Sequence, residues 1–307
     1  MELLASQQSM GNFVCVGLDS DPKRIPSAYS QLAFNQRLVE ATADFAGAYK
    51  PNLAFYPGPD GKKALMATIE FIWTHAPGVP VILDAKQGDI GSTNDGYIVD
   101  DFNYYGADAV TMHNYMGMEA MRPFLNQADK GVIVLVRTSN PGAGEFQDVE
   151  CVVMHHKPTD RVFSTIAEAE RELGEAMPVD GWQQIRMRHY QFVARRVFQA
   201  WNFNGNVCAV VGATVPAELS EVRAIVGNMP ILLPGIGAQG GDLEATVNAG
   251  RNTQGQGMII NNSRGIIFAY EKEDLPNPDQ FGVYARQAGI AMHNAIRAQL
   301  GLQPFGD

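Results

Sequence analysis

The chain has 307 residues, of which 46% are hydrophobic and 18% charged, and its formal net charge is −10. This composition supports a large packed core and excludes an intrinsically disordered chain. The acidic balance, without a basic run or an alternation of aromatic and basic residues, argues against a nucleic-acid-binding protein. No apolar run reaches the roughly 18 residues that a membrane span needs, and residues 1–11 lack the features of a signal peptide.

The three cysteines give information on the cellular compartment of the protein rather than on its reaction. Cys15 and Cys208 lie inside apolar runs, and Cys151 lies in a polar stretch. Reduced and mostly buried thiols in a cytoplasmic protein are therefore expected. Cys151, His155 and His156 fit no standard metal-ligand spacing, so an ordinary surface loop is favoured there over a metal site.

Eight short apolar runs alternate with amphipathic stretches along the chain. This alternation predicts parallel βαβ units, and eight strands are the number that closes a (β/α)₈ TIM barrel, an α/β fold. A doubly wound open sheet is the structural alternative, but no Gly-x-Gly-x-x-Gly follows the first strand. The expected strands are 13–18, 53–56, 80–83, 109–112, 131–136, 207–211, 231–233 and 258–260, and the expected helices are 35–47, 61–74, 93–105, 118–127, 183–201 and 216–226.

One segment breaks this rhythm, between the fifth and sixth expected strands. Residues 141–180 are polar and rich in Gly and Glu, and residues 183–203 resemble a long helix with a basic face. We expect residues 141–206 to form an insertion within a single barrel domain that spans residues 1–307. Its length leaves a role as a lid or as an interface open.

The stretch that ends the third expected strand, residues 81–93, carries the most chemistry. Asp84 and Lys86 are two residues apart and therefore share one face of a strand. Asp89 adds a second carboxylate after Gly88, and Ser92 or Thr93 is expected to cap the next helix. Burying such charges is costly unless each is paired, so a functional cluster is favoured over a surface ion pair.

Other strand ends also carry polar residues, and in a TIM barrel the active site lies at the C-terminal ends of the strands. His113 is expected to be packed or solvent-facing rather than part of the site. The direction of Lys50, just before the second expected strand, is ambiguous by one or two residues. The polar residues that follow the first, fourth and fifth strands are Asp19, Thr111, Asn114, Arg137, Thr138 and Ser139.

The last two strand ends predict a phosphate site. The glycine-rich residues 234–241 follow the seventh strand, and Arg264 follows the eighth. Glycine lets backbone N–H groups approach an anion, and a guanidinium offers it two donors at once. Because phosphate commonly binds after strands 7 and 8 of such barrels, we expect it between Gly237 and Arg264.

Taken together, these motifs resemble the orotidine 5′-phosphate decarboxylase family, in its longer bacterial subfamily. One departure is Gln87, where this subfamily more often has Arg. The matching segments, in this order, are Cys-Val-Gly-Leu-Asp (15–19), Lys-Pro-Asn-Leu-Ala-Phe-Tyr (50–56), Leu-Asp-Ala-Lys-Gln-Gly-Asp-Ile-Gly-Ser-Thr (83–93), Arg-Thr-Ser-Asn-Pro-Gly-Ala (137–143), Val-Gly-Ala-Thr-Val-Pro (211–216), Pro-Gly-Ile-Gly-Ala-Gln-Gly-Gly-Asp (234–242) and Asn-Ser-Arg-Gly (262–265).

The resemblance implies decarboxylation of orotidine 5′-monophosphate (OMP) to UMP in pyrimidine biosynthesis, without a cofactor or a metal. It assigns the charged network to Lys50, Asp84, Lys86 and Asp89, with Lys86 protonating the carbanion left at C6. Decarboxylation there leaves a charge that no adjacent carbonyl simply delocalises. An ammonium held among carboxylates can stabilise that charge and then donate a proton.

The resemblance also implies the substrate contacts and a homodimer. Asp89, Ile90 and Thr93 would cross into the pocket of the partner subunit. The remaining contacts divide by substrate group: Asp19 and Lys50 for the ribose, Ser139 for the pyrimidine, Gln239 between base and phosphate, and Pro234, Gly235, Gly237 and Arg264 for the phosphate.

Two other functions remain open from the residues. A magnesium-dependent sugar-phosphate decarboxylase or aldolase-like synthase on the same barrel would use Asp84 and a nearby Glu for the metal. The Thr-Ser-Asn at 138–140 and Gln239 argue against it. A non-catalytic nucleotide-phosphate-binding protein is disfavoured because every charged position is present.

Overall fold

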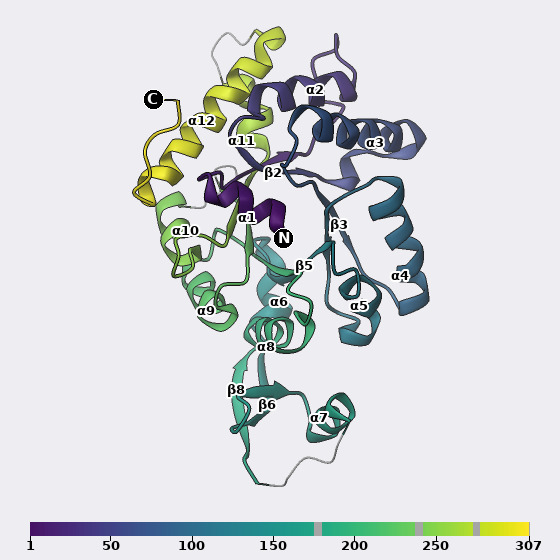
Figure 1. The fold of residues 1–307 in the computed structure, drawn as a ribbon, viewed down its shortest axis with the longest axis vertical. Helices are drawn as coiled ribbons and strands as arrows, with labels where there is room; N and C mark the ends of the chain where they lie inside the picture. Colours follow the sequence, from purple (N-terminus) through teal and green to yellow (C-terminus); the bar gives the residue numbers. More distant parts are fainter. Residues whose placement is uncertain (175–179, 237–241, 273–276, 307) are drawn as a thin grey trace.

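The computed structural model describes residues 1–174, 180–236, 242–272 and 277–306. Within these residues eight parallel strands form one sheet in the order β2-β1-β11-β10-β9-β5-β4-β3, with helices around it (Figure 1). Two isolated bridges, Tyr49 to Val81 and Asn52 to Asp84, join the outermost strands β2 and β3. The sheet is therefore a nearly closed barrel, and the predicted (β/α)₈ class is confirmed.

The barrel strands are mostly short and fully buried, as expected for parallel strands covered by helices. They are β1 Val14–Leu18, β2 Ala46–Pro51, β3 Ile82–Gln87, β4 Ala109–Met112, β5 Gly131–Arg137, β9 Val207–Val211, β10 Ile231–Pro234 and β11 Met258–Asn262. The helices packed around them are α2 Gln31–Thr42, α3 Gly58–His75, α4 Gly91–Ile98, α5 Gly117–Leu125, α9 Pro216–Val226, α10 Leu243–Gly250, α11 Arg264–Ile267 and α12 Phe281–Gln299.

The second strand differs from the prediction. Residues 53–55 form a 3₁₀ turn, and β2 lies earlier, where the end of a helix was expected. The small residues Ala46, Gly47 and Ala48 carry no strand signal of their own, so sequence periodicity could not find them. Gly47 is required by the packing, because a Cβ there would lie 2.4 Å from the carbonyl oxygen of Asn12.

Between β5 and β9 the chain leaves the barrel as the sequence predicts, and it forms a separate three-stranded antiparallel sheet in the order β7-β6-β8 (Figure 1). The strands are β6 Glu150–His156, β7 Arg161–Phe163 and β8 Trp182–Arg188. The helical pieces are the turn Pro141–Ala143, α6 Gly144–Gln147, α7 Ile166–Leu173, α8 His189–Arg196 and the π-helix Val197–Trp201. We call residues 141–206 the excursion.

The long helix expected over residues 183–201 is only partly correct. Its first part is β8, which pairs with the whole of β6, and the helix α8 begins at His189. The Gln191 side chain accepts a hydrogen bond from the backbone N–H of Arg188 and so caps the start of α8. Strand pairing with β6, a tertiary contact, overrides the local helical pattern.

No helix among the residues with described structure is long and apolar enough to cross a membrane. The N-terminal helix α1, Glu2–Ser9, lies at the N-terminal end of the barrel strands and places Leu4 in the barrel interior. This end of the barrel is thereby covered by apolar side chains, and polar side chains collect at the opposite end.

Candidate functional site

The alternation of side chains along each strand builds the site. Ala48, Ile82 and Ala109 belong to the apolar cluster inside the barrel. Because side chains two residues apart share a face, the next inward positions on β2, β3 and β4 are Lys50, Asp84 and Thr111. The same spacing that fills the barrel with apolar groups therefore brings charged groups to its C-terminal end.

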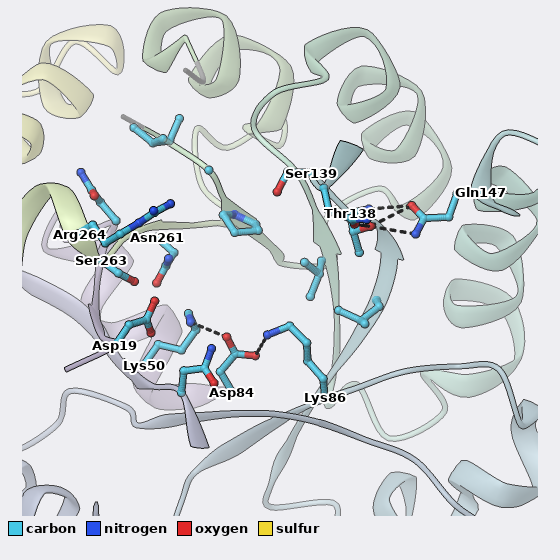
Figure 2. Close-up of a pocket in the computed structure, with 18 residues that line it drawn as sticks. Asp19, Lys50, Asp84, Lys86, Thr138, Ser139, Gln147, Asn261, Ser263 and Arg264 are labelled. Carbon is cyan, nitrogen blue, oxygen red and sulfur yellow. Dashed lines mark hydrogen bonds and ion pairs between the residues drawn. The ribbon is translucent and has the colours of Figure 1, made fainter. Parts of the chain in front are cut away.

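Asp84 is the centre of the charged cluster (Figure 2). One carboxylate oxygen accepts from the Nζ of Lys50 at 2.7 Å, and the other accepts from the Nζ of Lys86 at 2.6 Å. The second oxygen also accepts from the hydroxyl of Thr111 at 2.8 Å. Asp84 is only 7% exposed, so these charge-assisted bonds compensate for its lost hydration. The predicted pairing of Asp84 with Lys86 on one strand face is confirmed.

The charges of Lys50 and Asp84 stabilise each other. Burial alone would raise the pKa of Asp84, but Lys50 and then Lys86 outweigh it and hold that pKa well below its usual range. Burial alone would lower the pKa of Lys50, but Asp84 and then Asp19 outweigh it and raise that pKa. Both groups are therefore ionised at neutral pH.

Lys86 differs from Lys50 in exposure and in backbone shape. Its side chain is 49% exposed and lies at the mouth of the pocket. Its φ of 49° lies in the left-handed region, which costs a non-glycine residue roughly 1–2 kcal/mol. The backbone N–H of Lys86 donates to the hydroxyl of Thr111 at 3.0 Å, so Thr111 fixes both Asp84 and the turn that carries Lys86.

Thr111 was recognised in the sequence as a strand-end residue but was not included among the expected site residues. The sequence signal for Thr111 is its position two residues after Ala109, which places both side chains on the inward face of β4. The structure also shows the direction of the Lys50 side chain. Lys50 lies within β2, and its side chain points inward at the C-terminal end of the barrel, where the residue is 3% exposed.

A second wall of the pocket, next to Lys50, carries polar atoms from β1 and β11 and the residues that follow them (Figure 2). Among the described residues, Oδ1 of Asp19, Oδ1 of Asn261 and Oγ of Ser263 are buried without a hydrogen-bond partner. Gly17 makes room for this wall, since a Cβ there would lie 1.8 Å from the hydroxyl of Ser263. Unsatisfied polar atoms at a pocket are suited to the hydroxyl groups of a bound ligand.

The third wall comes from the turn after β5, residues 138–140, together with Gln147 of the excursion. Ser139 and Thr138 line the pocket, which has a volume of about 530 Å³ and fits the size range of small-molecule sites. Pro234 at the end of β10, Gly235 directly after it and Arg264 after β11 complete the pocket. Gln147 was missed in the sequence, because nothing in its local pattern indicates that α6 folds back to the barrel.

Three expected residues lie outside this pocket in the single chain. Ile90 and Thr93 are exposed, and Asp89 is half-buried. The Asp89 backbone N–H donates to Asn94, whose amide donates back to the Asp89 carbonyl. Within the described chain the ion pair of Lys86 is with Asp84, and none joins Lys86 to Asp89.

The expected helix cap at Ser92 or Thr93 is wrong, since α4 begins at Gly91 after Ile90, without a side-chain cap. Gly237 and Gln239 lie outside the described residues. His113 is half-buried and outside the pocket; its Nε2 lies 3.0 Å from the carbonyl of Gly88, which agrees with a packed histidine.

A metal site is not built by the part of the chain that the structure describes, where no group of three or more His, Cys, Asp or Glu is placed to hold an ion. His155 instead contacts Asp160, and His156 contacts Thr159. The cluster at the barrel end is thus one of alternating ammonium and carboxylate groups.

Comparison with known proteins agrees with this geometry. The family model described as "Orotidine 5'-phosphate decarboxylase / HUMPS family" matches residues 12–274. The chain is 42% identical over 301 residues to an orotidine 5′-phosphate decarboxylase of Azoarcus sp. (strain BH72), covering 96% of this chain and 97% of that protein. A protein of the same name from Ralstonia pickettii (strain 12J) is also 42% identical, over 96% of each chain.

Solved structures extend the likeness to the fold. The Leishmania donovani OMP decarboxylase is 33% identical, with a TM-score of 0.74 and 98% of each chain covered. The Leishmania donovani UMP synthase is 35% identical with a TM-score of 0.76, covering 97% of this chain and 56% of that one. The strand-end residues, the barrel and these matches lead to one conclusion: the chain belongs to the orotidine 5′-phosphate decarboxylase / HUMPS family.

Proposed function

We propose that this protein decarboxylates orotidine 5′-monophosphate to UMP and CO₂, as a carboxy-lyase that needs no cofactor. The observation that carries the proposal is the buried Asp84 carboxylate held between the ammonium groups of Lys50 and Lys86 at the pocket. Curated relatives about 42% identical over nearly the whole chain bear the name of this activity.

Lys86 is the proton donor in this mechanism. Loss of CO₂ leaves a negative charge at C6 of the pyrimidine, and a nearby ammonium stabilises it electrostatically. The Lys86 side chain is half-exposed at the pocket, whereas the Lys50 side chain, which also lines the pocket, is buried against Asp84. Lys50 therefore keeps Asp84 ionised, and Asp84 in turn orients Lys86 for transfer of its proton to C6.

Different walls of the pocket bind different groups of the substrate. Asp19 and Lys50 bind the ribose hydroxyls, and the unpartnered oxygen of Asp19 suits that role. Ser139 binds the amide edge of the pyrimidine. Arg264, with backbone groups near Gly235, binds the phosphate, and the expected roles of Gly237 and Gln239 belong to the same proposal. Phosphate contacts far from C6 supply binding energy that can be used to close the site.

The active unit is a homodimer with a shared site. Asp89, Ile90 and Thr93 do not line the pocket of their own chain, and Ile90 is 53% exposed despite being apolar. We propose that these residues enter the pocket of the partner subunit, where Asp89 of the partner subunit places a second carboxylate beside Lys86.

One experiment tests the activity. Purified protein is mixed with OMP, and the change in pyrimidine absorbance is followed with and without EDTA. We expect conversion to UMP at the same rate in both. Loss of turnover in EDTA would instead support a metal-dependent enzyme, and binding of OMP without turnover would support a nucleotide-phosphate-binding protein.

A further inference from the structure

Among the described residues of the excursion, Gln147 alone lines the pocket. This residue ends α6 and lines the pocket, as do Thr138, Ser139 and Asn140. Figure 2 shows it beside Thr138. The barrel strand β5 ends at Arg137, so the three residues of the turn extend beyond the sheet. Their position therefore depends on contacts other than the strand ladder.

The carboxamide of Gln147 binds the turn with both of its ends. Its Oε1 accepts from the backbone N–H of Thr138 at 2.8 Å. Its Nε2 donates to the Thr138 hydroxyl at 2.9 Å, and that hydroxyl donates to Oδ1 of Asn140 at 2.6 Å. One amide thus fixes the backbone at the start of the turn and, through Thr138, its end.

Gln147 is itself held by a buried cation. The Arg137 guanidinium, 7% exposed, donates to Oε1 of Gln147 at 3.2 Å and to the neighbouring Asp148 at 3.2 Å. The same guanidinium lies 3.8 Å from Glu218 at the start of α9. Ion pairs from two sides anchor the start of the excursion to the barrel, so Gln147 has a fixed base from which to bind the turn.

We propose that Gln147 is a positioning residue for base recognition: it holds the 138–140 turn so that Ser139 meets the pyrimidine edge of the substrate. This rests on the proposed function, in which Ser139 reads the base. It gives the excursion a role in specificity for the nucleobase. The groups that bind ribose and phosphate lie on the other walls of the pocket and do not depend on Gln147.

The test compares two ligands that differ by the base. UMP carries ribose, phosphate and pyrimidine, whereas ribose 5-phosphate lacks the pyrimidine. Affinities for both are measured by titration calorimetry for the wild type and for Gln147→Ala. We expect Gln147→Ala to weaken UMP binding about tenfold, in line with the loss of two hydrogen bonds. Binding of ribose 5-phosphate should stay within about twofold of the wild type, because its contacts are untouched.

Two further variants complete the test. Gln184→Ala makes the same substitution at an exposed position of β8, in the excursion but away from the pocket, and should leave both affinities unchanged. Gln147→Glu keeps the acceptor for the Thr138 N–H but loses the donor to its hydroxyl, so its UMP affinity should fall between those of wild type and Gln147→Ala. This variant also carries the test if Gln147→Ala does not fold.

Equal weakening of both ligands, or an unchanged ratio of the two affinities, would overturn the positioning role. Turnover of OMP by the wild type separates this result from the larger question. If the wild type does not convert OMP, the proposed function fails. If it does, and the affinity ratio is insensitive to Gln147, only the role of Gln147 is lost.

Discussion

At the scale of single residues, Lys86 carries its charge on a strained backbone. Lys86 is one of two non-glycine residues at positive φ among those described, and it lies within β3, two residues after the inward Asp84. Such backbone strain persists only where surrounding contacts enforce it. Here the contacts are the Thr111 hydroxyl on the Lys86 N–H and the Asp84 carboxylate on its Nζ. Together they hold the Lys86 ammonium beside Asp84 at the pocket.

Replacement of Lys86 by alanine tests its role as proton donor. We expect Lys86→Ala to fold normally and to lose about 10³-fold or more in kcat, since both charge stabilisation and proton transfer disappear. Steady-state kinetics with OMP measures the loss, and thermal unfolding checks the fold. Lys63→Ala, at an exposed lysine of α3, is the control. More than a few per cent of wild-type rate in Lys86→Ala would exclude Lys86 as the donor.

Arg264 tests the phosphate assignment. Its guanidinium is exposed at the edge of the pocket, so Arg264→Ala should leave the fold intact. We expect KM for OMP to rise by roughly 10- to 100-fold, the size of a charge-assisted bond of about 1.5–3 kcal/mol. Binding of the free nucleoside uridine should hardly change. An unaltered KM would show that the phosphate lies elsewhere.

At the scale of elements, the π-helix that follows α4 carries a buried carboxylic acid close to Gln87 of β3. Asp101 lies in the π-helix Val99–Tyr104, 0% exposed, and neither of its oxygens makes a hydrogen bond of normal geometry within the described residues. Burial raises the pKa of Asp101 to about 7, an effect that the nearby Gln87 amide only partly offsets. Gln87 is a neutral amide, so it gives the Asp101 carboxylate no counter-ion.

The raised pKa of Asp101 predicts that the free energy of unfolding depends on pH. Because the folded-state pKa of Asp101 exceeds the ordinary value of 3.8 for an aspartate, the native state binds an extra proton between pH 3.8 and about 7. The stability that protonated Asp101 contributes is fully present below pH 3.8 and is lost as the pH rises from there through about 7. We expect Asp101→Asn to raise the free energy of unfolding at pH 8 by about 1–3 kcal/mol, and by much less at pH 5.

Urea unfolding at the two pH values measures the difference. Asp95→Asn, at an exposed position of α4, is the matched control and should change neither value. An equal effect of Asp101→Asn at pH 5 and pH 8 would mean that Asp101 is ionised, or neutral, throughout this range. The result bears on the site because β3 carries both Gln87 and the charged pair Asp84 and Lys86.

At the scale of the whole molecule, the chain brings Lys50, Asp84 and Lys86 together and leaves Asp89, the fourth member of the proposed charged network, outside the pocket lining. Lys50, Asp84 and Thr111 come from three neighbouring strands whose ends meet. The chain segment with Asp89 and Ile90 leaves the same strand end and does not return to the pocket lining. A shared site in a two-fold dimer would supply the missing carboxylate.

Mixing inactive variants tests this arrangement. Asp84→Ala and Asp89→Ala should each lose most activity alone. When the two are co-expressed, a mixed dimer has one site with both substitutions and one site with neither. Random pairing then restores about a quarter of wild-type activity per subunit. Co-purified mixed dimers with no more activity than the separate variants would argue that each chain builds its own site.

By itself the sequence determined the barrel and the centre of the site. Buried parallel strands appear as short continuous apolar runs, and side chains two apart share a face, so the sequence predicts that Asp84 and Lys86 lie on the same side of their strand. The tertiary structure alone decided where β2 lies, that β8 is a strand, that Thr111 bonds Asp84 and that Gln147 reaches the pocket. These features depend on contacts between residues distant in the chain, such as Gly47 against Asn12, β8 along β6 and Gln147 on Thr138. Local periodicity carries no record of such contacts, because only the closed fold brings those residues together.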